Sequence, residues 1–152
     1  PPRSPQASLL DRDARRHIVW VGILIAAITL AIGAFYYEPG DKTWQTMMFT
    51  TLAFTQIGHA LGLRAARDKV RGWRSIVAAL RANPAVAGLA ALTVVLQVAA
   101  VYVPFLDRFF EVVPLSTANF GLCVALGLVV WGAVEVERRL LQRQKARLAR
   151  QD

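Results

Sequence analysis

The chain has 152 residues, 55% of them hydrophobic, and a formal net charge of +8 at pH 7. Its one cysteine excludes a disulfide framework, and its two histidines lie far apart without the clustered ligands that a zinc site requires. The positive charge would suggest nucleic acid as a partner of a soluble protein, but no nucleic-acid-binding module accompanies it.

Four apolar stretches follow one another along the chain, over residues 17–37, 44–63, 84–103 and 116–136. Each has about 20 residues, enough at about 1.5 Å per residue to cross the roughly 30 Å hydrocarbon core of a bilayer. The sequence therefore predicts an all-α fold, a polytopic membrane protein with four transmembrane helices. Residues 1–152 are expected to form a single transmembrane domain.

The basic residues indicate the orientation of these helices. All but two of the 18 precede the first stretch, lie between the second and third, or follow the fourth; the exceptions are Lys42 and Arg108. Because positively charged short loops stay in the cytoplasm, both termini and the middle loop are predicted to be cytoplasmic. The expected location is integral to a bacterial plasma membrane. The expected partner is the lipid bilayer, with no nucleic acid.

The connecting segments have their own signals. Residues 71–81 place apolar side chains at helical spacing among arginines, which predicts a cytoplasmic interfacial helix. Asn83-Pro84 supplies a cap and a first helical residue for the third stretch. The phenylalanines in residues 105–113 suggest a segment at the outer interface, and residues 138–152 form a charged cytoplasmic tail.

Polar side chains within the stretches are candidate sites, since a polar group at membrane depth is costly unless it is paired. The second stretch has the most of them: Thr46, Thr50, Thr51, Thr55, Gln56 and His59. At 100° per residue, Thr51, Thr55, Gln56 and His59 share one face. They could coordinate an ion, with Gln56 offering a carbonyl oxygen, or simply form hydrogen bonds between helices. His59 could also titrate or relay protons.

Other polar and small residues within the stretches are better explained by helix packing than by ion binding. Thr93 and Gln97 are i, i+4 neighbours with the same two interpretations, and Cys123 is expected to be a small buried apolar residue. Gly58 and Gly62 would let another helix approach closely. No charged residue lies well inside a stretch, because Glu135 and its neighbours are at the inner end of the fourth, so the chain alone does not look able to move an ion.

Several segments, taken in order, resemble the last membrane helices of P-type cation-transporting ATPases of the calcium-pump type. Residues 1–5 resemble the loop before the seventh helix of that family, and residues 46–61 resemble its eighth helix. The ninth helix and the loop after it are resembled by residues 96–97, 102–106 and 114–116. Residues 135–138 resemble the end of the tenth helix. The resemblance covers essentially the whole chain.

The resemblance implies a C-terminal membrane module, helices seven to ten, of an ATP-driven pump that transports Ca²⁺. The main ion-binding helices of that family lie outside this chain. The eighth helix of two-site calcium pumps adds a glutamate ligand, and Gln56 stands at the matching position. A neutral amide competes poorly for a divalent cation, so a second calcium site is in doubt and Gln56 would be a weak ligand. His59 matches a position where some relatives carry a polar or acidic ligand.

Asp41-Lys42-Thr43 matches the start of the phosphorylation motif of that family, Asp-Lys-Thr-Gly, but Trp44 replaces the glycine and the tripeptide lies in a short outer loop. We therefore predict no catalytic residue and no cofactor within this chain. ATP and Mg²⁺ are expected for the parent pump, whose other membrane helices and cytoplasmic domains would be the partners. The alternative is a standalone four-helix membrane protein, a subunit or regulator that binds another membrane protein through its Gly58/Gly62 face.

Overall fold

A computed structural model describes residues 12–65 and 73–148, and within these residues it is helical without strands. The long helices are α1 (Arg12–Phe35), α2 (Thr43–Ala65), α4 (Pro84–Tyr102) and α6 (Thr117–Leu148), and the short ones are α3 (Trp73–Ala82) and α5 (Pro104–Phe110). The predicted all-α fold is confirmed. The terminal residues 1–5, which entered the family resemblance, lie outside the described residues.

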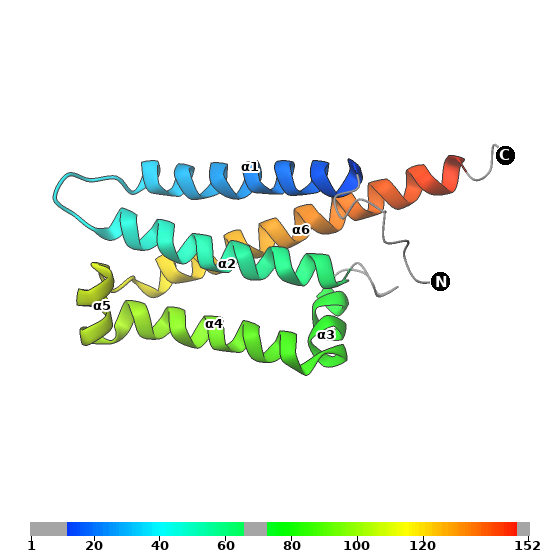
Figure 1. The fold of residues 1–152 in the computed structure, drawn as a ribbon. Helices are drawn as coiled ribbons and strands as arrows, with labels where there is room; N and C mark the ends of the chain where they lie inside the picture. Colours follow the sequence, from blue (N-terminus) through cyan, green and yellow to red (C-terminus); the bar gives the residue numbers. More distant parts are fainter. Residues whose placement is uncertain (1–11, 66–72, 149–152) are drawn as a thin grey trace.

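The long helices lie side by side as a bundle (Figure 1). The start of α1, the short α3 and the end of α6 lie at one end of the bundle, while the α1–α2 turn and α5 lie at the other. We call these the inner end and the outer end, after the orientation that the basic residues predict. Helix α2 contacts α1, α4 and α6, which makes it the central helix of the bundle.

Local sequence explains where the helices begin and end. Asn83 caps α4 because its side-chain oxygen accepts hydrogen bonds from the backbone N–H groups of Ala85 and Val86, at 2.9 and 3.3 Å, as predicted. Pro84 is the first residue of the helix. In the α1–α2 turn, Gly40 has a φ of 89°, a left-handed conformation that favours glycine.

Among the described residues, three helices are long and apolar enough to cross a membrane: Ala14–Phe35 within α1, Pro84–Tyr102, and Thr117–Gln144 within α6. Helix α2 has 23 residues, so its length would suffice, but its threonines, glutamine and histidine lower its apolar content. The second of the four predicted spans is therefore a helix at the expected place, with a composition unlike that of the other three.

The remaining boundaries differ from the predicted ones by a few residues. The interfacial helix predicted over residues 71–81 is α3, and residues 71 and 72 lie outside the described part of the chain. The fourth span and the charged tail form one continuous helix of 32 residues, α6, with residues 149–152 again outside the description. The phenylalanine-rich segment forms α5, and Phe105 and Phe109 are exposed there, as an interfacial segment would require.

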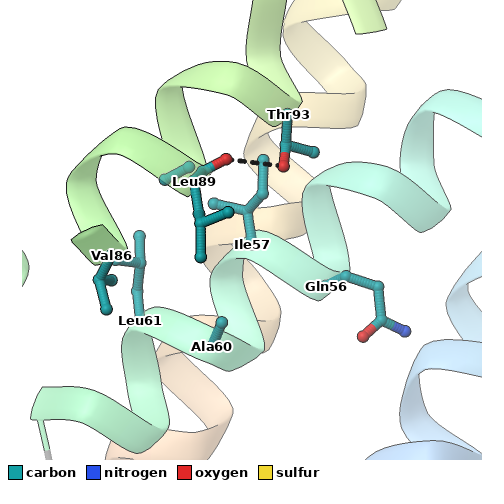
Figure 2. A pocket seen from close by; sticks show the side chains of 8 residues that line it. Gln56, Ile57, Ala60, Leu61, Val86, Leu89 and Thr93 are labelled. Atoms are coloured by element: carbon teal, nitrogen blue, oxygen red, sulfur yellow. Dashed lines mark hydrogen bonds between the residues drawn. The ribbon is translucent and has the colours of Figure 1, made fainter. Parts of the chain in front are cut away.

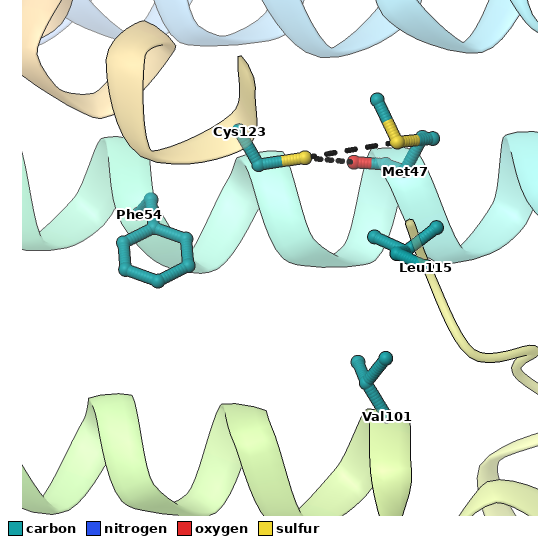
Figure 3. Close-up of a cluster of buried hydrophobic side chains, with 5 residues drawn as sticks. All are labelled: Met47, Phe54, Val101, Leu115 and Cys123. Atoms are coloured by element: carbon teal, nitrogen blue, oxygen red, sulfur yellow. Dashed lines mark hydrogen bonds between the residues drawn. The ribbon is translucent and has the colours of Figure 1, made fainter. Parts of the chain in front are cut away.

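The buried core lies between α2 and its neighbours. Figure 3 shows its larger cluster, formed by Met47, Phe54, Val101, Leu115 and Cys123. The thiol of Cys123 lies 3.8 Å from both the carbonyl oxygen and the sulfur of Met47 and is fully buried. The interpretation of Cys123 as a small buried residue is confirmed. A second cluster joins α1 to α6 through Val21, Ile25, Val130 and Val134.

Candidate functional site

The candidate site is α2, and one of its faces is closed by α6. A Cβ atom added to Gly58 would lie 2.0 Å from the carbonyl oxygen of Gly127, and one added to Gly62 would lie 2.8 Å from a methyl group of Val134. The backbones of α2 and α6 therefore touch at Gly58, and at Gly62 the side chain of Val134 fills the space, as predicted for a close helix approach. The alternative in which this face binds another protein is wrong in that detail, because α6 of the same chain occupies it.

Four threonines of α2 are fully buried, and three of them bond to neighbouring segments. Thr46 accepts a hydrogen bond from the backbone N–H of Val113 at 2.8 Å, and Thr50 accepts one from the Gln97 amide at 2.9 Å. Thr51 donates a hydrogen bond to the Cys123 sulfur at 3.4 Å. Thr55 donates one to the Leu52 carbonyl of its own helix at 2.9 Å. These contacts support interhelical hydrogen bonding and leave the threonine hydroxyls little freedom to meet an ion. Gln97 is structural in the same sense, and Thr93 bonds to its own helix at Leu89.

Gln56 lies on the opposite side of α2 from Gly58 and is exposed. It borders a pocket of about 250 Å³ between α2 and α4, yet its carboxamide points away from the other labelled residues, among them Ile57 and Leu89 (Figure 2). It makes no hydrogen bond with any described residue. The surface around it, which we call the outward stripe of α2, consists of Phe49, Leu52, Gln56 and Leu63.

His59 belongs to a different surface from Gln56. Its Nε2 lies 3.3 Å from Nε2 of His17 on α1, and Nδ1 of His17 lies 2.5 Å from a carboxylate oxygen of Glu137 on α6. The residues predicted to share one face of α2 have different surroundings: Thr51 and Thr55 are buried, His59 contacts α1 and Gln56 is exposed. His17 escaped sequence analysis, although its place at the inner end, at the same depth as His59, could have indicated it.

Charged groups at the inner end of α6 are paired. Glu135 is 3% exposed and bonds to both Arg138 and Arg139, the latter at 3.0 Å. Glu137, two residues further on, bonds to His17 of α1. Among the described residues, no three His, Cys, Asp or Glu side chains form a complete metal-binding group.

Asp41 has a structural role at the outer end. Its carboxylate accepts hydrogen bonds from the backbone N–H and the hydroxyl of Thr43, both at 2.9 Å, at the start of α2. The backbone bond is the larger cause that lowers the pKa of Asp41 below its ordinary value, because it stabilises the charged form. This arrangement is an Asx turn that leads the chain into α2.

The chain is similar to parts of known cation-transporting ATPases. A family model described as "Cation transporting ATPase, C-terminus" matches residues 1–140. The chain is 26% identical over 144 residues to calcium-transporting ATPase 1 of Yarrowia lipolytica, covering 93% of this chain and 15% of that protein. It is 28% identical over 99 residues to a plasma membrane-type calcium-transporting ATPase 13 of Arabidopsis thaliana, covering 65% of this chain and 9% of that protein. The chain thus spans less than a sixth of either relative.

Proposed function

Because the chain belongs to the family of cation-transporting ATPase C-terminal regions, we propose that it is the support module of an ATP-driven Ca²⁺ pump. Helices α1, α2, α4 and α6 cross the bilayer with both ends of the chain in the cytoplasm. Hydrolysis of ATP with Mg²⁺ takes place in other parts of the pump, and this module has no catalytic activity of its own. Calcium is the proposed cation because both relatives are named calcium-transporting ATPases.

The observation that carries this proposal is the division of α2 into two faces. Thr50 bonds to Gln97 of α4, and Gly58 and Gly62 pack closely against α6, so these helices form one unit. Its outward stripe is left exposed, with Phe49, Leu52 and Leu63 between about two fifths and half exposed. An exposed stripe on the central helix of a bundle is the natural place for further membrane helices of the pump to pack.

Gln56 is the polar group on the part of this stripe nearest the middle of α2. The carbonyl oxygen of an amide is a hard ligand of the type that Ca²⁺ accepts, although it lacks the charge of a carboxylate. We expect Gln56 to contribute one oxygen, directly or through a water molecule, to an ion site built mainly by helices outside this chain. The role of the module is then to hold Gln56 and the outward stripe at a fixed position.

Transport assays on the complete protein in vesicles test this role. Gln56→Ala is expected to raise the Ca²⁺ concentration needed for half-maximal transport about tenfold or less, the size of effect that a neutral, weak ligand would give. Gln56→Glu is expected to lower it, because a carboxylate binds Ca²⁺ more strongly. Gln45→Ala is the matched control, since Gln45 is also exposed on α2 but lies near the outer end. Unchanged Ca²⁺ dependence in both Gln56 variants would leave Gln56 as packing.

The mass of the natural protein separates this proposal from the standalone alternative. An antibody against residues 138–152 would detect the protein in its own membranes. A species several times heavier than the 16.7 kDa of this chain supports a module within a pump. A species of 16.7 kDa would instead mean a separate membrane protein, and the search would turn to its partner.

A further inference from the structure

The inner end of the bundle brings together three side chains from three helices. His17 of α1 stands between His59 of α2 and Glu137 of α6, although 42 residues separate the two histidines and 120 separate His17 from Glu137. The side chains of His17 and Glu137 are 18% and 15% exposed, so both are mostly covered by the bundle. Neither the cation-support role nor the packing of the helices requires two imidazoles to meet here.

We propose that His17 and His59 form a binding site for a transition-metal dication such as Zn²⁺, linking α1 to α2. Two imidazole nitrogens that bind one tetrahedral zinc ion at about 2.0 to 2.1 Å lie about 3.3 to 3.4 Å from each other. The two Nε2 atoms are 3.3 Å apart. The ring centroids are 5.5 Å apart and the ring planes are inclined by 35°. Metal binding would replace the hydrogen bond between the two Nε2 atoms and would turn both rings until their lone pairs meet at one ion.

Glu137 prepares His17 for this role. Histidines that bind metals almost always donate the N–H of their other nitrogen to a carboxylate or carbonyl, which fixes the tautomer and increases the basicity of the ligand. Nδ1 of His17 makes such a contact with Glu137 at 2.5 Å. The proton of a neutral His17 is therefore placed on Nδ1, and Nε2 keeps its lone pair for the metal.

Open space borders one of the two proposed ligands. A pocket of about 270 Å³ is lined by His17, Gly62, Glu137, Arg138 and Gln142, among others, but not by His59. Since no third side-chain ligand is present among the described residues, water or an added ligand would fill the other positions. Glu135 and Glu137 together balance the two positive charges of Arg138 and Arg139, so these four groups leave the site without net charge.

The chemistry of the ligands separates this site from the proposed calcium pathway. Imidazole suits Zn²⁺, Ni²⁺ and Cu²⁺, whereas Ca²⁺ selects oxygen ligands. His59 therefore serves a metal other than the transported cation, and Gln56 does not belong to the same site. A bound metal ion would connect the inner ends of α1 and α2 and oppose their separation.

Metal titration of the intact protein in detergent tests the site. With Co²⁺ as a visible probe of tetrahedral coordination, we expect one equivalent to bind in competition with Zn²⁺ and not with Ca²⁺. His17→Ala and His59→Ala should each weaken this binding at least tenfold, and the double variant should be little worse than either single one, because both remove the same site. Glu137→Gln should weaken it about 10- to 100-fold, as removal of an outer partner of a ligand does.

The controls decide between this site and other metal-binding groups of the protein. Gln142→Ala changes the same pocket without touching a ligand and should leave the affinity unchanged. Zn²⁺ should raise the midpoint of thermal unfolding of the native protein and of Gln142→Ala, but not of His17→Gln or His59→Gln, which keep side chains of similar size. Failure of Co²⁺ to bind, or binding that survives the loss of both histidines, would overturn the proposal.

Discussion

Helices α2 and α4 are neighbours of similar length. The more apolar helix, α4, has exposed side chains, whereas the more polar helix, α2, has buried ones. Helix α4 is apolar enough to be recognised as a membrane span, yet Leu89, Val95 and Leu96 are all more than half exposed. Helix α2 lacks that apolar composition, and four of its threonines are completely buried. In water the reverse would hold, because burial there follows hydrophobicity. In a bilayer the apolar side chains of α4 face lipid, and polar ones must find partners inside the protein.

The apolar composition of a helix therefore indicates which helices touch lipid, but it does not indicate which helix makes the most contacts within the bundle. Beside Met47 and Phe54 in the core, many contacts of α2 are made by small and polar residues: glycines against α6 and threonine hydroxyls against α4 and the loop before α6. Such contacts depend on close fit and on hydrogen bonds, since no hydrophobic effect drives helices together within lipid. Substitutions on α2 should therefore be far more damaging than similar ones on α4.

The largest difference is expected between two glycines. Gly58→Ala places a Cβ atom 2.0 Å from the backbone oxygen of Gly127, and a backbone cannot move aside as a side chain can. We expect a loss of about 3 kcal/mol or more in stability, seen as a failure to recover folded protein in detergent. Gly88→Ala on α4 is the control, because nothing lies within 4 Å of its added Cβ atom. Equal recovery of the two variants would refute the close contact of α2 with α6.

The buried carboxylate at the inner end of α6 should show the next largest effect. Glu135→Gln removes the charge that faces Arg138 and Arg139, and we expect a loss of about 2 kcal/mol in unfolding free energy. The side chain of Arg139 is 42% exposed, so its share is reduced by solvent screening. Glu111→Gln breaks the exposed pair with Lys42 and should change stability by less than about 1 kcal/mol. Denaturation of both variants in detergent makes the comparison.

The contact between α2 and α4 should contribute less. Thr50→Val removes the acceptor of the Gln97 amide, and we expect a loss of about 1 kcal/mol, within the range of membrane helix hydrogen bonds. Thr93→Val serves as the control because the Thr93 hydroxyl bonds only within its own helix. A double variant with Gln97→Leu should recover part of the loss, since neither partner then leaves a buried polar group unpaired. Strict additivity of the two single changes would argue against a direct bond.

Patterns among neighbouring residues predicted the helices, but they did not predict the contacts between side chains of different helices. The Asn83 cap, a helix after residue 72 and the close approach at Gly58 follow from neighbouring residues or from residue size, and the structure confirms them. The location of that helix at the membrane interface stays a prediction. The meeting of His17 with Glu137 depends on how three helices pack, which periodicity along one helix does not reveal. The orientation of Gln56 shows the same limit: residues at i, i+3 and i+4 were assigned to one face, but a face of a central helix is divided among several neighbours.

The smallest effect on stability is expected at Gln56, and that result sharpens the contrast between the faces of α2. Gln56 is exposed and makes no hydrogen bond with any described residue, so Gln56→Ala should change the unfolding free energy by no more than about 0.5 kcal/mol. Thermal unfolding in detergent measures this directly. A stable variant with altered Ca²⁺ dependence of transport would separate a functional outward stripe from a structural inward face. A destabilised variant would mean that Gln56 belongs to the packing of α2, and its contribution to an ion site would no longer be needed to explain its presence.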